Sequence, residues 1–587
     1  MTARQGAPGQ AYARRMIRRL LVALALGTAA LAHARPLAAT FTALDDDDAT
    51  IPPDPSGAVG PAHLVAIAGT QLRIQSKTGA VLSTQPVGNL FTALGHTTHV
   101  PARVVYDALA GHWIVVATAD GGTAVEVAVS TTTDPTGAYH AYSLPIVAAT
   151  ALNVRVGFNG ALIAIAMDLV DVGTTTSRGV RIYACAKTAL YTGTATCHAN
   201  DRAPALGDRS PEPALTYDTD MDEILVERDT SGDVRLLQIT GVVGSETISS
   251  VGFSLNVSPW AASGPQTNLG FAPQAGTLNR LDTGDDRITS AVVRHHHVFA
   301  TQTIYLPQAN PTRTAVQWFE LDGYLPIQVG RIDDATGAFD YAYPTIAVNL
   351  HDDVMVTFAK LGASISPSAA YAARLHGDPL GQLSPDALVR AGGGTYAKTH
   401  GGTVNRWGGA GGAAVDPADD ATLWAIAAVA AAPDPSPCTL DCGNWSTVWA
   451  ALGTDCLGQA NGVACDTNLC LDGPQVCSGG ACTGGTPTTC TAPECYTTGA
   501  CVSDSGCPAI VANDGTPCTE GVCQFGQCQH YADDFPFGGD PSDPSPDAPV
   551  HDPLVPGKTG GCCEIGGNPG GFVLAFGVAL ALRRRRR

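Results

Sequence analysis

Three consecutive histidines, His295, His296 and His297, are candidates for metal chemistry, because imidazole nitrogens are common ligands of transition metals. Neighbouring residues of a strand point to opposite faces, so at most two of them, such as His295 and His297, can share an ion unless the segment is a turn. The segment lies between the apolar runs ITSAVV and VFATQTI, where a hairpin turn is expected. A plain exposed turn and a transition-metal site are both open.

Two acidic segments are further candidates. Asp218, Asp220 and Asp222 alternate like the first ligands of a calcium loop, but Glu223 and Asp229 replace the Gly and Glu that an EF-hand requires. Structural calcium is therefore an alternative to a turn, and no other cofactor is expected. The segment LDTGDDR is predicted to form either a salt-bridged turn or part of a ligand mouth, through Asp282, Asp285, Asp286 and Arg287.

A recurrent corner explains many of the remaining acids. In five segments a Ser or Thr precedes Gly, and a β-former follows one residue later: DPSGAV at Asp54, SKTGAV at Ser76, DPTGAY at Asp134, DTSGDV at Asp229 and DATGAF at Asp334. Asp and Ser at the start of a turn accept backbone N–H groups, and Gly adopts positive φ without steric cost. These acids are predicted to form hairpin turns rather than to catalyse a reaction.

Short Val-, Ile- and Ala-rich runs such as HWIVVATAD and VMVTFA recur between these corners, too closely for crossover helices. We predict an all-β fold in which residues 54–430 form a β-propeller of about six or seven blades. A pair of large β-sandwiches is the alternative.

The N-terminal part carries an export signal. Residues 1–34 combine a basic region, an apolar run and the ending Ala32-His33-Ala34, so cleavage after Ala34 is expected. Residues 35–53 are predicted to be a solvated acidic leader, with Asp45 to Asp48 in a row. The net charge is −20, and loss of both basic ends would bring it to about −30. Such a surface repels nucleic acid and anionic lipid.

Cysteine usage agrees with export. Of the 18 cysteines, most lie in a block over 438–530 that follows a linker over 431–437. Disulfides are expected there because the block has too few apolar residues for a core, with zinc as the alternative. The block contains Cys438, Cys442, Cys456, Cys465, Cys470, Cys477, Cys482, Cys490, Cys495, Cys501, Cys507, Cys518, Cys523 and Cys528. Cys185 and Cys197 are expected to pair with each other.

The C-terminal part has two further segments. Residues 531–560, rich in Asp, Pro and Gly, are predicted to be a disordered stalk. Residues 561–587 contain Cys562 and Cys563, an apolar stretch and five terminal arginines. From Ile565 the stretch has about 18 residues, near the lower limit for a helix that spans a bilayer.

Several segments carry a family resemblance. PPDPSGAVGPAHLVAIAG, APQAGTLNRLDTGDDRITSAVVR and NRWGGAGGAAVDPADDATLWAIA, in order over residues 52–428, resemble exported bacterial proteins with a sialidase-like β-propeller. The tail resembles C-terminal sorting signals of myxobacterial surface proteins, and the Cys block resembles myxobacterial Cys-rich repeats. This implies processing and lipidation at Cys562 or Cys563, a processing protease as a partner, and a place at the outer membrane of a Gram-negative bacterium.

The sequence lacks the common hydrolase motifs. H-E-x-x-H and G-x-S-x-G are absent from the sequence. Sialidase chemistry would need an arginine triad that binds a carboxylate, a tyrosine nucleophile and acid/base carboxylates. The candidates are Arg103, Arg155, Arg181, Arg287, Arg294, Tyr106 and Tyr217. Linear sequence does not bring them together.

The sequence therefore predicts a non-enzymatic binding or adhesion protein at the cell surface, with an extracellular carbohydrate or protein as its ligand. A sialidase-like glycoside hydrolase is the alternative, and a structural envelope protein is a third.

Overall fold

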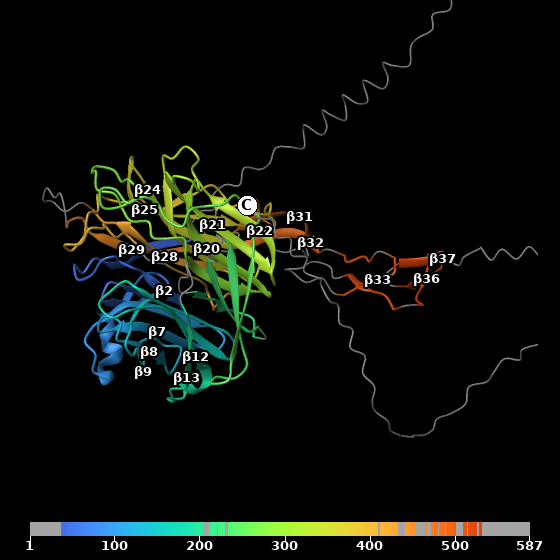
Figure 1. Cartoon of the computed structure of the whole chain (residues 1–587). Helices are drawn as coiled ribbons and strands as arrows, with labels where there is room; N and C mark the ends of the chain where they lie inside the picture. Colours follow the sequence, from blue (N-terminus) through green and yellow to red (C-terminus); the bar gives the residue numbers. More distant parts are fainter. Residues whose placement is uncertain are drawn as a thin grey trace, which may run out of the picture. The chain divides into compact units, whose positions relative to one another are not determined.

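The structure is a computed structural model that describes residues 37–203, 211–219, 221–228, 233–408, 411–432 and 441–453, with short segments between 464 and 530. It divides into two units, and the smaller consists of Pro493–Tyr496 and Val511–Arg587. The larger unit is an all-β propeller, as predicted. Figure 1 shows its sheets arranged around a common centre.

Five of its sheets have four antiparallel strands each. The first contains β2 (Ser56–Val59), β3 (His63–Ala68), β4 (Gln71–Ser76) and β5 (Val81–Pro86). The second contains β6 (His99–Asp107), β7 (His112–Ala119), β8 (Ala124–Ser130) and β9 (Tyr139–Pro145). The third contains β14 (Glu212–Pro213), β16 (Glu223–Arg228), β17 (Val234–Thr240) and β18 (Thr247–Phe253). The fourth contains β23 (Asp340–Val348), β24 (Val354–Gly362), β25 (Ile365–Arg374) and β26 (Ala387–Arg390). The fifth contains β27 (Gly412–Val415), β28 (Leu423–Ala430), β29 (Trp445–Leu452) and β1 (Ala39–Asp45).

A nine-stranded sheet contains two further meanders of four strands. One runs through β10 (Thr150–Phe158), β11 (Leu162–Val170), β12 (Ser177–Ala186) and β13 (Cys197–Arg202). The other runs through β19 (Ile288–Arg294), β20 (His297–Leu306), β21 (Arg313–Asp322) and β22 (Leu325–Ile332). The short strand β15 (Leu215–Thr216) joins them by parallel pairing with β10 and β19. The five separate four-stranded sheets are fewer than the six or seven blades predicted, because β15 fuses these meanders.

The first strand of each meander lies next to the first strand of the following one. These contacts run from β2 through β6, β10, β14, β19, β23 and β27 and return to β2. Close approach at the centre favours small residues. A Cβ atom at Gly57 on β2 would lie 2.5 Å from the Trp449 ring, which explains the glycine in the strand DPSGAV. Two short helices, η1 (Val87–Leu94) and α2 (Lys187–Tyr191), lie between strands.

The N-terminal strand closes the ring, which differs from the predicted domain boundaries. Residues 39–45 were expected in a solvated leader, but they form β1 and pair with β29. β29 in turn lies beyond the predicted end of the propeller at residue 430. Two groups hold Asp46 in place. Its Oδ2 accepts hydrogen bonds from Lys398 Nζ at 2.7 Å and from the backbone N–H of Trp445 at 3.2 Å. Asp46 of the acidic run thus neutralises a buried lysine, while Asp45 and Asp48 stay exposed to solvent.

The recurrent corners are turns, although only some are hairpins. Asp134 and Asp334 each accept the backbone N–H of the Thr two residues later, at 2.9 and 3.0 Å. Asp134 lies in a hairpin between β8 and β9, whereas Asp334 lies between β22 and β23, which belong to different sheets. In DPSGAV the prediction of a hairpin is wrong, because Ser56–Val59 is β2 itself. Residues 229–232 of DTSGDV lie outside the described residues.

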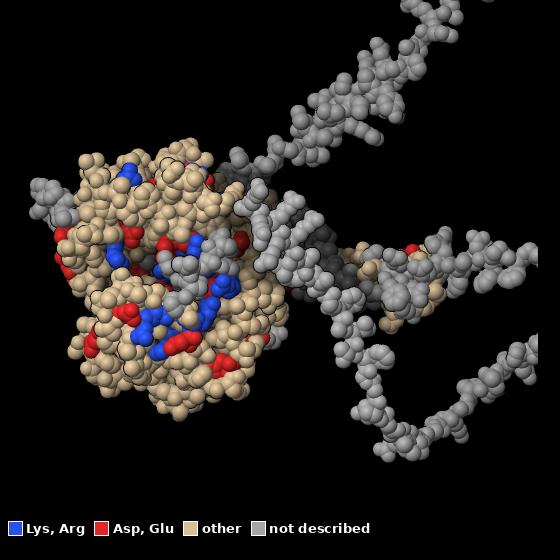
Figure 2. Space-filling model, viewed as in Figure 1, with Lys and Arg blue, Asp and Glu red and all other residues tan. Residues whose placement is uncertain are grey.

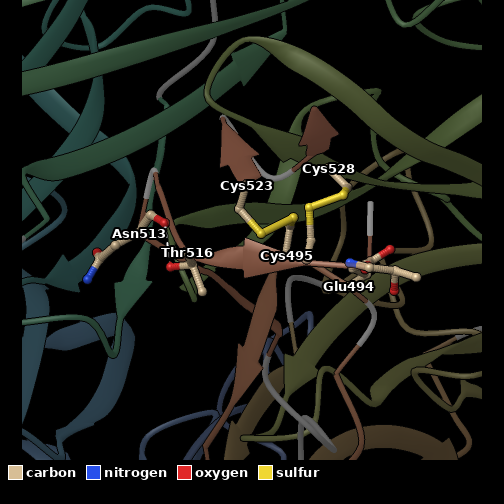
Figure 3. The surroundings of a disulfide bond; sticks show 8 residues. Glu494, Cys495, Asn513, Thr516, Cys523 and Cys528 are labelled. Atoms are coloured by element: carbon tan, nitrogen blue, oxygen red, sulfur yellow. Dashed lines mark hydrogen bonds between the residues drawn. A yellow bond between two sulfur atoms is a disulfide. The ribbon is translucent and has the colours of Figure 1, made fainter. Parts of the chain in front are cut away.

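Disulfides occur in both units. Cys185 and Cys197 are bonded and join the paired strands β12 and β13. In the smaller unit Cys495 is bonded to Cys523 and Cys518 to Cys528 (Figure 3). Cys442, Cys477 and Cys490 are also disulfide-bonded. These bonds are typical of an oxidising, extracellular environment.

The Cys block contains short strands. They are β30 (Ala464–Cys465), β31 (Leu471–Ser478), β32 (Ala481–Pro487), β33 (Tyr496–Thr498), β34 (Ala509–Val511), β35 (Pro517–Cys518), β36 (Gly521–Gln524) and β37 (Gln527–His530). Within the described part of the chain, no helix has the length and apolar character needed to cross a membrane. Cys562, Cys563 and the predicted C-terminal helix lie outside that part.

Candidate functional site

A cavity of about 50 Å³ lies where the first strands meet. Charged residues from the neighbouring strands β6, β10 and β14 line one side, and small residues of β19, β27 and β2 line the other. The charged ones are Arg103, Arg155 and Glu212. A cavity needs about 10–15 Å³ to hold one water, so this cavity has room for a few waters or for one carboxylate-sized group. Figure 2 shows charged side chains gathered in a hollow of the viewed propeller face.

Local irregularities in the first strands position these arginines. The pairing of β6 with β7 shifts between His99 and Ala102, just before Arg103. The pairing of β10 with β11 shifts between Leu152 and Arg155. Such bulges bend a strand and redirect the side chains next to them, and they are frequent at functional sites.

Two arginines near the cavity form two-pronged ion pairs with carboxylates, although Nε of Arg103 has no hydrogen-bond partner among the described residues. Arg103 makes a two-pronged ion pair with Asp54, and both N–O distances are 2.9 Å. Arg287 makes the same kind of pair with Asp285, at 2.8 and 2.9 Å, and its Nη1 reaches Asp168 at 3.3 Å. Asn153 fixes Asp168 by donating to its Oδ2 at 2.7 Å. Each of these guanidinium groups already has its counter-charge.

Arg155 is different. Its Nη1 lies 3.5 Å from Oε2 of Glu212, and neither atom makes a hydrogen bond with any residue that the structure describes. Within the same described ranges its Nε also has no hydrogen-bond partner, although Arg155 is only 5% exposed. Buried polar atoms of this kind are normally satisfied, so the cavity offers unfilled hydrogen-bond donors and an unfilled acceptor to a small polar ligand.

Burial controls the titration of this pair. It raises the pKa of the Glu212 carboxyl to about 7, against the lowering effects of Arg155, Arg103 and Arg287. Burial also lowers the pKa of Arg155, and the positive charges of Arg103 and Arg287 act in the same direction. Three of the five candidate arginines therefore converge on Glu212.

The other two arginines lie elsewhere. Arg181 pairs with Asp201 across β12 and β13, and Arg294 pairs with Asp420 and lies over the Tyr217 ring. Neither Tyr217 nor Tyr106 lines the cavity, and Tyr106 packs on Trp113.

The segment LDTGDDR forms salt-bridged turns beside this site. Besides the pair of Asp285 with Arg287, Asp286 pairs with Arg228 and accepts the Trp260 indole N–H at 3.0 Å. Burial raises the pKa of Asp282 and of Asp286. The segment is an ion-paired turn, and its role as part of a ligand mouth stays a prediction, because none of its four candidate residues is among the described residues that line the cavity.

The histidine run is a turn between β19 and β20, in which His295 and His296 have positive φ. Asp218 accepts both of their backbone N–H groups, at 3.1 and 2.7 Å. The His295 ring contacts Asp352, whereas the His297 ring contacts Glu320, so the two rings point to different carboxylates. Asp222 accepts a hydrogen bond from Gln238, and Asp220 lies outside the described residues. Structural calcium stays a prediction.

Sequence reasoning missed Glu212, Asp54 and Asp168 as members of the site. Asp54 was assigned to a turn, and Asp168 sits in an apolar strand. Glu212 has no motif around it. Only the ring arrangement brings residues from β10, β14 and the segment before β19 together.

Comparisons with known proteins give no family. Neither a protein-family model nor a curated protein matches the chain. Similar solved structures include a protein of unknown function from Dyadobacter fermentans, at 9% identity and a TM-score of 0.31, covering 70% of this chain and 99% of that one. The hemagglutinin-neuraminidase ectodomain of parainfluenza virus 5 has 10% identity and a TM-score of 0.30, covering 65% and 95%. An exo-β-1,3-galactanase from Phanerochaete chrysosporium has 10% identity and a TM-score of 0.28, covering 71% and 99%. At these identities and TM-scores the likeness says nothing about the function of this chain.

Proposed function

We propose that this protein is an exported, surface-attached binding module whose propeller holds an anionic group of an extracellular ligand in the central cavity. The observation that carries the proposal is the buried Arg155 guanidinium, which faces the cavity with two nitrogens that lack hydrogen-bond partners. A carboxylate bound to such a group makes charge-assisted hydrogen bonds, which are stronger than neutral ones. Acidic carbohydrate and protein carboxylates both offer this chemistry.

The composition of the lining favours binding over hydrolysis. Among the described residues, those that line the cavity include one carboxylate, Glu212, and no tyrosine. Hydrolysis with two carboxylates requires a second one on the opposite side of the scissile bond. One observation supports hydrolysis as the second candidate, because a carboxyl that titrates near pH 7 suits a general acid.

The proposal includes the location of the protein outside the cell. Disulfides agree with an oxidising compartment. The N-terminal signal supports export. The resemblance of the tail supports processing at Cys562 or Cys563 by a sorting protease and attachment to the outer membrane of a Gram-negative bacterium. We expect no nucleic-acid partner.

A glycan array with matched acidic and neutral glycans tests the proposal. We expect signals confined to glycans that carry carboxylates, and we expect the substitution Arg155→Met to abolish them. Arg181→Met is the matched control, because Arg181 pairs with Asp201 away from the cavity. Binding that is equal for neutral glycans or unchanged in Arg155→Met would overturn the proposal. Turnover of fluorogenic glycosides by the wild type, lost in Glu212→Gln, would favour the hydrolase.

A further inference from the structure

We propose that an anion enters the central cavity together with one proton, which Glu212 takes up, so that occupancy of the site depends on acidity. This inference rests on the proposed function and describes the regulation of the same site. The one covalent change is a proton transfer: hydronium or a protonated buffer molecule loses a proton, which forms the O–H bond of the Glu212 carboxyl, while the covalent bonds of the ligand stay unchanged.

The charge balance of the site leads to this inference. Asp54 neutralises Arg103, and Asp285 with Asp168 neutralises Arg287. Among the described residues Arg155 forms its ion pair with Glu212, and Asp54, which is paired with Arg103, acts on it as a second negative charge. An incoming anion would therefore add an uncompensated negative charge to a buried space, which is strongly unfavourable. Protonation of Glu212 removes that excess, because the ligand then replaces Glu212 as the counter-charge of Arg155.

The geometry leaves room for the exchange. The 3.5 Å between Arg155 Nη1 and Glu212 Oε2 is an ion pair without a hydrogen bond, and both atoms line a cavity large enough for a carboxylate. A ligand oxygen can accept from the guanidinium, and a protonated Glu212 can donate to that ligand. Nε and Nη1 of Arg155 and Oε2 of Glu212, which have no hydrogen-bond partner among the described residues, then have possible partners.

The groups around Glu212 place the exchange near neutral pH. Three guanidinium groups face it, from Arg155 on β10, Arg103 on β6 and Arg287 before β19. Asp54, Asp168 and Asp285 face those guanidinium groups in turn. The three cations oppose protonation, yet burial outweighs them and the pKa of Glu212 lies at about 7.

The test uses the full chain and sodium glucuronate as the probe, because its carboxylate stays ionised between pH 6 and 9. Isothermal titration calorimetry in buffers of different ionisation enthalpy gives both Kd and the number of protons taken up. We expect Kd to be constant well below pH 7 and to rise about tenfold per pH unit above it, with uptake of one proton per ligand at pH 8.

Two substitutions separate the causes. Glu212→Gln is expected to bind glucuronate with a Kd independent of pH and without proton uptake. Glu246→Gln is the control and should keep the wild-type pH profile, because Glu246 lies with His198 and Asn200, away from the cavity. The proton count of the wild type tests the inference even if a variant does not fold.

The outcomes are distinguishable. Wild-type binding with the same Kd at pH 6 and 9 and no proton uptake would overturn the inference and leave the proposed function intact. Absence of glucuronate binding at pH 6, where Glu212 is mostly protonated, would overturn the anion site and the proposed function with it.

Discussion

Lys398 links the two ends of the propeller, and its removal should open the ring. Its Nζ donates to Asp46 Oδ2 at 2.7 Å and also contacts Asp48. The side chains of Lys398 and Asp46 are 3% and 2% exposed, whereas Asp48 is 79% exposed. Although burial opposes its charge, the hydrogen bonds to the two aspartates raise the pKa of Lys398. The pair of Lys398 with Asp46 is therefore the buried part of this ion bridge.

The substitution Lys398→Met keeps most of the apolar volume but leaves the Asp46 carboxylate buried without a cation. Loss of one partner of a buried ion pair costs about 3–5 kcal/mol. We expect the free energy of unfolding to fall by this amount in equilibrium urea unfolding, followed by the fluorescence of the buried tryptophans, which include Trp445 and Trp449 of the closing sheet. The double variant Asp46→Asn with Lys398→Met should recover more than half of the loss, because an amide needs no counter-charge.

The control is Lys360→Met. Its ion pair with Asp386 is more exposed, at 16% and 20%, so its loss should cost much less. An unfolding midpoint of Lys398→Met equal to that of the wild type, or a double variant no more stable than Lys398→Met alone, would refute the explanation of ring closure.

Three further predictions concern stability. Burial raises the pKa of Glu223 well above its usual value, and neither carboxylate oxygen has a hydrogen-bond partner. In the folded state Glu223 keeps its proton at pH values where the unfolded chain has lost it, so the free energy of unfolding should fall as pH rises above 4.5. In urea unfolding, Glu223→Gln should be more stable than the wild type at pH 7, and its stability should depend less on pH. Glu212 should lower the stability in the same way as pH rises from 4.5 to about 7. The pH dependence of the melting temperature in that window should therefore be weaker in Glu212→Gln and unchanged in Glu246→Gln. Replacing both Cys185 and Cys197 by Ala should cost about 2–3 kcal/mol in urea unfolding, and equal stability with the wild type would show that this bond adds nothing.

Local patterns predicted the elements well, because each depends on neighbouring residues. Alternating apolar runs gave the strands, and the acid-and-glycine corners gave turns such as those at Asp134 and Asp334. The hairpin interpretation failed at Asp54, because the following glycine serves contact with Trp449 rather than a positive φ. The role of β1 in closing the ring could not be predicted for another reason. Its partner β29 lies some 400 residues later in the sequence and follows a segment that has the composition of a linker.

The candidate site was only partly predictable. Arg103, Arg155 and Arg287 were among the arginines considered, but nothing in the linear order distinguished them from Arg181 and Arg294. Their convergence depends on which positions of β6 and β10 follow a bulge, and on the neighbouring arrangement of strands from three meanders. Glu212 could not be predicted, because its importance arises from burial and from three cations that are distant in sequence.

A crystal structure of the protein soaked with glucuronate at pH 6 tests the central claim most directly. We expect a carboxylate within about 3 Å of the Arg155 guanidinium and of a Glu212 oxygen, with the pairs of Arg103 with Asp54 and Arg287 with Asp285 unchanged. A bound glucuronate at any other place, with the central cavity free of it, would contradict the claim that this cavity is the ligand site.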